Sequence, residues 1–170
     1  MKNLKDIEEK KKEIVEKYGM FMEKHENFPP IAARIFSTLL LAENRGATFE
    51  ELVSFLSASK STVSTNLQKL TKMEIVEYHT KPGDRKKYFT LSPIGFIAFL
   101  DEDLKKFKAE KVLVEEILEF KTSANKIITD PAQKFEHVEK NVFLDYLENS
   151  IKGLEILKEH VKSKCFNSNK

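Results

Sequence analysis

Apolar residues recur at helical spacing along most of the chain, and the pattern predicts a series of helices separated by short turns. The first predicted helix covers residues 5–25 and stops at Phe28-Pro29-Pro30, because proline is disfavoured inside a helix but suits its first turn. The second covers residues 31–44 and is apolar nearly all round, so we expect it to be buried at the centre of a domain. Asn44-Arg45-Gly46-Ala47 is expected to end that helix and turn the chain.

Two short helices joined by a tight polar connection are predicted next. Thr48-Phe49-Glu50-Glu51 has the form of a capping box, in which the threonine hydroxyl and the last carboxylate each accept from the other residue's backbone amide. Ser59 is placed to cap the second helix, whose apolar side consists of Val63, Leu67 and Leu70. Two helices joined in this way are typical of a helix-turn-helix, in which the second helix enters the major groove of DNA.

The outer face of this second helix is small and uncharged at its start and basic at its end, with no acid between Ser59 and Lys72. A merely solvated face usually mixes Glu and Lys, whereas hydroxyl and amide groups can bond to base edges and phosphates. Base edges or nearby phosphates are the expected partners of Ser61, Thr62, Thr65 and Gln68. Phosphates are the expected partners of Lys60, Lys69 and Lys72. An ordinary polar surface helix is the alternative.

A basic β-hairpin is predicted directly after this helix. Ile75-Val76-Glu77-Tyr78 and Lys87-Tyr88-Phe89-Thr90-Leu91 read as strands, and Lys81-Pro82-Gly83-Asp84-Arg85-Lys86 as the turn between them. A hairpin in this position is a wing, whose cationic tip can reach phosphates or the neighbouring minor groove. The wing residues expected to contact DNA are Arg85, Lys86 and Lys87. The alternative for the hairpin is an ordinary solvated turn with lysines. The alternative for Arg85 is a structural salt bridge to Asp84 or Glu77.

The part after the hairpin is long for a winged helix. Ser92-Pro93 restarts a helix whose apolar stripe continues to Phe120, Asp130-Pro131 breaks the chain, and residues 135–161 form a further helix or helix pair. The apolar stripes at both chain ends exceed what a small winged helix needs, so we expect them to meet a second copy. Packing on their own domain alone is the alternative. A dimer would also bring two recognition helices to a palindromic site on double-stranded DNA.

The predicted fold class is mainly α with a small β-hairpin wing, a winged helix-turn-helix with long N- and C-terminal dimerisation helices. Residues 1–28 are the expected N-terminal dimerisation helix, and residues 29–92 the DNA-binding domain. Residues 93–170 are the expected C-terminal dimerisation region, which could also bind an effector.

Composition and charge narrow the function further. The net charge of +2 hides a local excess, because the segment 59–91 has seven Lys or Arg against three acids and the remainder of the chain carries −2. Such a footprint favours a polyanion partner. Cys165 has no second cysteine to pair with, no apolar leader is visible, and no apolar run is long enough to cross a membrane. We therefore expect a cytoplasmic protein.

An enzyme is not expected. The four histidines are scattered without metal-ligand spacing, and the sequence has neither a glycine-rich phosphate loop nor a nucleophile elbow. No cofactor and no metal are predicted.

Several blocks of sequence together resemble the MarR-type winged-helix regulators, and more closely their GbsR branch. The resemblance lies within residues 29–91 and rests on Pro30-Ile31-Ala32-Ala33-Arg34-Ile35, residues 48–56, Ser59-Lys60-Ser61-Thr62-Val63-Ser64 with Asn66-Leu67, and Lys81-Pro82-Gly83-Asp84-Arg85-Lys86. It implies a homodimeric DNA-binding transcriptional regulator, usually a repressor, that dimerises through its terminal helices. Some members of the GbsR branch sense choline-like ligands.

A choline-like effector would need aromatic faces around its quaternary ammonium group. The candidates by position are Phe120, Phe135, Phe143 and Tyr146, for which ordinary core packing is the alternative. At the level of the whole protein, the alternative function is a winged-helix scaffold for protein–protein interaction without DNA binding.

Overall fold

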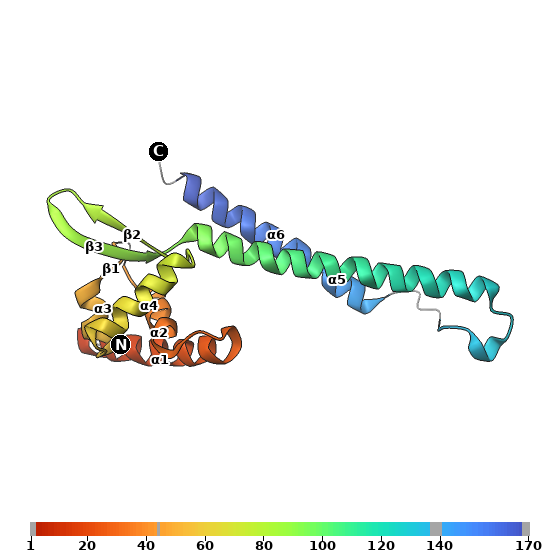
Figure 1. Cartoon of the computed structure of the whole chain (residues 1–170), viewed down its shortest axis with the longest axis horizontal. Helices are drawn as coiled ribbons and strands as arrows, with labels where there is room; N and C mark the ends of the chain where they lie inside the picture. Colours follow the sequence, from red (N-terminus) through yellow and green to blue (C-terminus); the bar gives the residue numbers. More distant parts are fainter. Residues whose placement is uncertain (1–2, 44, 137–140, 168–170) are drawn as a thin grey trace. The chain divides into compact units, whose positions relative to one another are not determined.

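The computed structural model describes residues 3–43, 45–136 and 141–167, the last three as backbone only. Contacts divide the chain into two compact units, Met1–Gly95 and Phe96–Lys170. The first unit holds four helices and a small sheet, and the second holds most of one long helix and a further helix beside it (Figure 1). The N-terminal helix therefore belongs to the same unit as the helix-turn-helix and its wing.

Two helices open the first unit, α1 (Leu4–Glu26) and α2 (Pro30–Leu40). As predicted, Pro30 begins α2, and most of that helix is buried. It ends four residues before the expected position, however, and Leu40 is 47% exposed. The reason is tertiary: the chain must leave the helix early so that Ala47 can pair in the sheet, and Gly46 turns it there with a φ of 75°. Asn44, part of the expected turn, lies outside the described residues.

A half-buried arginine fastens α1 to α2. The guanidinium of Arg34 on α2 donates to Glu16 (Nε to Oε2, 3.1 Å), to Glu23 and to the carbonyl of Pro30 (3.0 Å). Gly19 gives the arginine stem room, since a Cβ there would lie 3.1 Å from its Cγ. Because the hydrogen bond from Arg34 favours the charged carboxylate, the pKa of Glu16 is lowered.

The helix-turn-helix has the predicted form. In α3 (Phe49–Leu56) both halves of the capping box are present: the Thr48 hydroxyl accepts from the amide of Glu51, and the Glu51 carboxylate from the amide of Thr48 (2.8 Å). Ser57 turns the chain with a φ of 50°, and Ser59 caps α4 (Lys60–Lys72). The two helices share one core with α2 and the sheet, formed by buried residues that include Ile35, Leu39, Leu52, Val63, Leu67, Leu70, Val76 and Phe89.

The sheet has three antiparallel strands in the order β1-β3-β2: β1 (Ala47–Thr48), β2 (Val76–Lys81) and β3 (Asp84–Leu91). The two-residue strand β1 was not predicted, because its pairing with Phe89 and Tyr88 comes from a distant part of the chain. The predicted turn was too long. Lys81 pairs with Asp84, so only two residues, Pro82 and Gly83 (φ 79°), make the turn.

The second unit is built around an antiparallel helix pair (Figure 1). α5 (Pro93–Ile127) runs beside α6 (Val142–Asn167), with Leu100, Leu104 and Leu147 buried. Ion pairs cross between the helices at Asp101–Lys158, Lys108–Glu155 (2.6 Å) and Lys111–Glu148 (3.1 Å).

The second predicted C-terminal helix begins later than expected. It starts at Val142 rather than Phe135, which lies instead in the connection after a short turn of 3-10 helix, η1 (Pro131–Gln133). The side-chain amide of Asn125 holds this connection, because its oxygen accepts from the amide of Phe135 and its nitrogen donates to the carbonyl (both 2.8 Å). The Asn125 side chain thus bonds to both backbone groups of Phe135, which a helix would otherwise satisfy. The spacing of apolar residues does not predict a contact of this kind.

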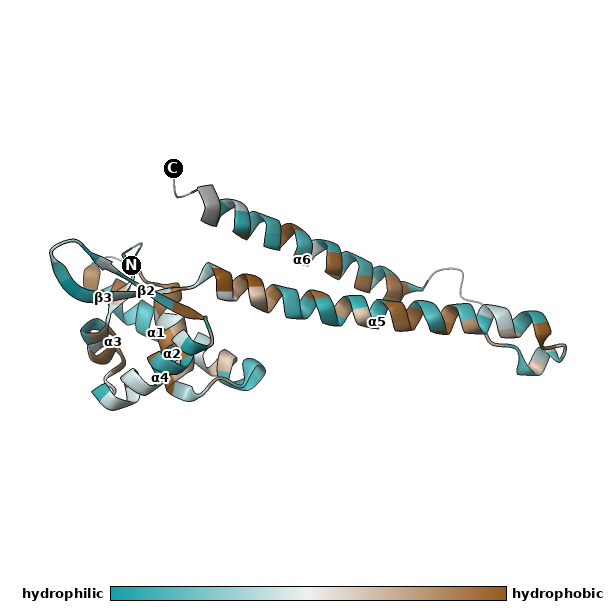
Figure 2. Cartoon of the chain, turned by 45° about the horizontal axis from the view of Figure 1, so that its top comes forward, coloured by the Kyte–Doolittle hydropathy of each residue, from teal (hydrophilic) through white to brown (hydrophobic). Residues whose placement is uncertain are grey.

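Large apolar side chains remain exposed on the long helices. Figure 2 shows hydrophobic residues along both α5 and α6. The exposed ones on α5 include Val112, Leu113, Ile117 and Phe120, and those on α1 include Leu4, Ile7, Met20 and Phe21. Within the described part of the chain, none of the helices is both long and apolar enough to span a membrane.

Candidate nucleic-acid interface

Helix α4 presents the two faces that the sequence predicts. Val63, Leu67 and Leu70 are buried, whereas the outer face is exposed at Lys60, Ser61, Thr62, Thr65, Gln68, Lys69 and Lys72. The whole helix contains no acidic residue. All seven predicted contact residues of this helix are thus accessible to a large partner.

Linked hydroxyl groups surround the start of α4. The Ser59 hydroxyl accepts from the amide of Thr62 (3.1 Å) and bonds to the hydroxyls of Ser61 (3.0 Å) and Thr62 (2.7 Å). The cap therefore orients two of the predicted contact residues before any partner arrives. The end of a helix where free amides gather also favours an anion.

The wing tip is ordered by Asp84 rather than by Arg85. The Asp84 carboxylate accepts from the amide of Lys86 (2.9 Å) and from the hydroxyl of Tyr88 (2.7 Å). These bonds hold the pKa of Asp84 below its usual value and raise the pKa of Tyr88. Arg85 is exposed and makes no ion pair with a described residue, so the proposed pairing with Asp84 or Glu77 is not observed.

Two lysines of the hairpin each lie over a tyrosine ring, and the two contacts are on opposite faces of the hairpin. The ammonium of Lys87 lies 4.0 Å from the ring centre of Tyr78, and that of Lys81 lies 4.3 Å from the ring centre of Tyr88. Sequence reasoning missed Tyr78 as a candidate contact residue. Its position in the sequence, one residue after Glu77 in a strand that extends beyond the core, could have indicated an accessible aromatic side chain. In the structure Tyr78 is 46% exposed.

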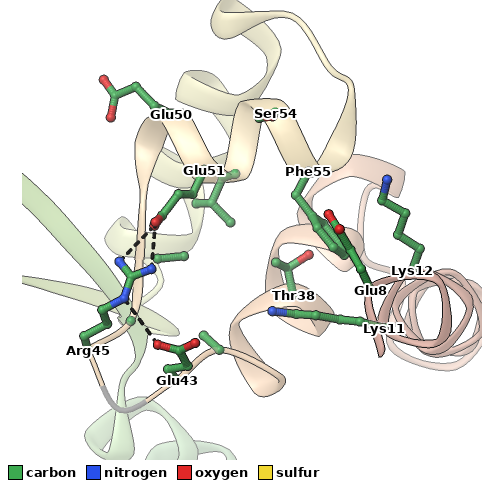
Figure 3. A pocket seen from close by; sticks show the side chains of 14 residues that line it. Glu8, Lys11, Lys12, Thr38, Glu43, Arg45, Glu50, Glu51, Ser54 and Phe55 are labelled. Atoms are coloured by element: carbon green, nitrogen blue, oxygen red, sulfur yellow. Dashed lines mark hydrogen bonds and ion pairs between the residues drawn. The ribbon is translucent and has the colours of Figure 1, made fainter. Parts of the chain in front are cut away.

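A cleft elsewhere in the first unit is lined by side chains of both charges. The lining residues of this cleft come from α1, the end of α2, the segment after it and α3 (Figure 3), and its volume is about 490 Å³. Its walls carry Lys11, Lys12 and Arg45 but also four glutamates, two of which, Glu51 (2.7 Å) and Glu43 (3.4 Å), pair with the arginine. Such a surface does not have the single sign of charge that a polyanion requires.

The four candidate effector residues fall into two pairs. Phe120 contacts Phe135 edge to face, with 5.7 Å between the ring centres, and Phe143 stacks on Tyr146, with 5.9 Å between the ring centres. No ring contact between described residues joins one pair to the other. All four are 37% to 63% exposed, so the alternative that they are ordinary core is wrong for the single chain. An aromatic cage stays a prediction.

Metal chemistry gains no support from the described residues, among which no group of three His, Cys, Asp or Glu side chains could hold an ion. The side chains of His137 and Cys165 lie outside the described residues.

A capped helix pair followed by a β-hairpin defines this chain as a winged helix-turn-helix protein. No known protein-family profile matches it. It is similar to the HTH-type transcriptional regulator MmpR5 of Mycobacterium tuberculosis (strain ATCC 25618 / H37Rv), with 34% identity over 86 residues, which are 51% of this chain and 52% of that protein. The match thus spans about half the length of this curated relative. The name of this relative is that of a transcriptional regulator, the class of protein that the sequence predicts.

Solved structures of regulators are similar at lower identity. A crystal structure of a transcriptional regulator has 22% identity and a TM-score of 0.48, covering 94% of this chain and 98% of its own. The S. aureus MepR–DNA complex has 17% identity and a TM-score of 0.40, covering 75% and 97%. The winged helix-turn-helix fold of this chain is defined by the helices and strands already described.

Proposed function

We propose that this chain is a sequence-specific transcriptional regulator that binds duplex DNA as a homodimer. The observation that carries the proposal is the outer face of α4, which is exposed, free of acids and lined by hydroxyl, amide and ammonium groups. Those groups can bond to base edges and phosphates in the major groove. The wing that follows this helix in the chain adds three exposed cations, Arg85, Lys86 and Lys87, of which Lys87 lines a groove together with residues of α4.

The similarity to a named transcriptional regulator supports the same function. The finer assignment that we propose is a MarR-type repressor of the GbsR branch, which rests on the sequence blocks described above. Repression would follow if the bound dimer occludes a promoter. An effector would regulate it by favouring one of two spacings between the recognition helices.

A homodimer is supported by the apolar side chains that a single chain leaves in water. Many exposed large apolar side chains of this kind are typical of an association surface, and a second copy offers the same surface in return. Light scattering after size exclusion measures the mass directly. We expect twice the 19.7 kDa of one chain, and a single-chain mass at micromolar concentration would contradict the dimer.

A salt titration tests DNA binding and separates it from the scaffold alternative. The α4 face and the wing offer six cations per protomer: Lys60, Lys69, Lys72, Arg85, Lys86 and Lys87. If each neutralises one phosphate, the logarithm of the binding constant falls with the logarithm of salt with a slope of about −5 per protomer. Fluorescence anisotropy with a labelled duplex measures this slope. Absence of duplex binding at low salt would favour the scaffold.

A matched pair of double variants locates the charge effect. Lys69→Gln with Lys72→Gln should weaken binding and flatten the salt slope by about 2 per protomer. Lys106→Gln with Lys126→Gln removes the same charge from exposed positions of the second unit and should change the slope little. Equal effects of the two variants would mean that binding does not use the α4 face.

A further inference from the structure

A groove separates the recognition helix from the wing and has a lining unlike that of the other clefts. It encloses about 460 Å³ between α4 and the face of the hairpin that carries Tyr78 and Phe89. Its apolar lining consists of Phe49, Leu67 and Phe89, the last two of them buried, and Gln68, a predicted contact residue, also lines it. The groove therefore lies beside the candidate interface.

The charge in this groove has one sign. Lys72 enters the lining from the helix and Lys87 from the hairpin, and no acidic residue lines it. The remaining polar groups are hydroxyls and an amide, from Ser64, Gln68, Thr71 and Tyr78, all of which can donate to an anion. The cleft in Figure 3 has four glutamates among its lining residues, and a cleft in the second unit has three acids against three lysines.

Strand register explains how Tyr78 and Lys87 come together. Tyr78 pairs with Phe89, and Lys87 lies two residues before Phe89, so all three side chains are on the same face of the hairpin. The ammonium of Lys87 is 4.0 Å from the ring centre of Tyr78, a cation–π contact that restrains a long side chain. Tyr78 nevertheless remains 46% exposed, so part of its side chain stays accessible to a partner.

We propose that this groove seats a phosphodiester of the DNA backbone, with Tyr78 as a contact residue and Lys72 and Lys87 as the charges on either side. The inference rests on the proposed function. If α4 occupies the major groove and the wing reaches the adjacent minor groove, the backbone strand that divides those grooves must cross between helix and wing. A phosphodiester there meets two ammonium groups and a phenol hydroxyl without an opposing carboxylate.

The hydroxyl and the charge are tested separately. Tyr78→Phe keeps the ring under Lys87 and removes only the donor, so affinity should fall about tenfold, the usual effect of losing a hydrogen bond to a charged group, while the salt slope stays unchanged. Lys87→Gln should lower affinity and also flatten the salt slope by about 0.9 per protomer. Both losses should be uniform across DNA sequences, because phosphates carry no base identity.

Lys81→Gln is the matched control. It removes an equal charge from the same hairpin and breaks an equivalent cation–π contact, 4.3 Å from the ring centre of Tyr88, on the opposite face. The assay is anisotropy with a duplex of about 30 base pairs, enough for two half-sites one helical turn apart, recovered by selection from a random pool. Ethylation interference on the same duplex should lose the same phosphate in Tyr78→Phe and Lys87→Gln, but not in Lys81→Gln.

The possible outcomes distinguish a failure of the phosphate seat from a failure of the proposed DNA binding. Parental affinity in Tyr78→Phe, or identical behaviour of Lys87→Gln and Lys81→Gln, would overturn the phosphate seat and leave DNA binding standing. A loss confined to some base sequences would also overturn it, since that is base readout. If the parent chain binds no duplex at low salt, the proposed function fails and the seat fails with it.

Discussion

Glu51→Gln tests how the start of α3 is held, and with it the support for the recognition helix. The Glu51 carboxylate accepts from the amide of Thr48 (2.8 Å) and from two nitrogens of Arg45 (2.7 and 3.3 Å), as Figure 3 shows for the arginine. Glutamine keeps the shape of the side chain but has one oxygen and no charge. Because α3 packs against α4 in a common core, loosening its first turn lowers the stability of the whole first unit.

The size of the effect follows from the pKa of Glu51. The hydrogen bond from Arg45, followed by the backbone and hydroxyl bonds of Thr48, lowers this pKa from 4.5 to about 2. At full strength such a difference between folded and unfolded states corresponds to about 3 kcal/mol of unfolding free energy. The side chain is 45% exposed, so solvent screening reduces the expected contribution to about 1 kcal/mol. That value is also typical of a lost helix cap.

Urea denaturation followed by circular dichroism measures the effect and its pH dependence. A carboxylate whose folded-state pKa is lowered stabilises the protein above pH 4.5, and this stabilisation is lost as the pH falls toward 2. Glu51→Gln should therefore cost about 1 kcal/mol at pH 7, and the deficit should shrink as the pH approaches 3. Glu50→Gln, an equal change one residue earlier in the same helical turn, is the control and should cost less. Equal costs at pH 7, or a deficit that does not shrink in acid, would refute the reasoning.

Three further predictions address the wing, a close backbone approach and the effector. Arg85→Ala should weaken duplex binding without changing the melting temperature, and should cost more on A·T-rich flanks if the guanidinium enters the minor groove; unchanged affinity removes Arg85 from the site. Gly95→Ala should lower the unfolding free energy by about 2 kcal/mol because the new Cβ would lie 2.1 Å from the carbonyl oxygen of Glu74. Gly153→Ala, whose Cβ meets nothing within 4 Å, should raise it by up to about 1 kcal/mol, and equal melting curves of the two variants would contradict this account. Titration calorimetry with choline and glycine betaine tests the aromatic pairs of the second unit, and no heat at millimolar ligand would end that hypothesis.

The parts of the fold that the sequence predicted well are those governed by short-range chemistry. The capping box at Thr48 and the cap at Ser59 were predicted because each involves residues only three positions apart. The apolar stripe of α4 was predicted for the same reason, since three leucine and valine side chains at helical spacing define one face. Local patterns of this kind need no knowledge of the rest of the chain.

The failures have tertiary causes. β1 has only two residues and no pattern of its own, and it exists because Phe89 and Tyr88 supply the partner strand. The early end of α2 follows from the same pairing. Tyr78 was missed because strand patterns do not reveal how far a hairpin extends past its core, and only the register places Lys87 over its ring. Residues that depend on such pairings become recognisable as site residues only when the pairing is known.

The distribution of ion pairs gives the site a signal that charge counting could not. Away from the interface, several lysines lie against acids: Lys10 and Lys17 bond to Glu13, and Lys108 bonds to Glu155. Across the α4 face and the wing, none of the six cations pairs with an acid among the described residues. Like charges gathered without counter-charges repel one another and destabilise the fold unless an anionic partner neutralises them. The sequence shows a local excess of +4, and the structure adds that the six cations of the α4 face and the wing make no ion pair with a described acid.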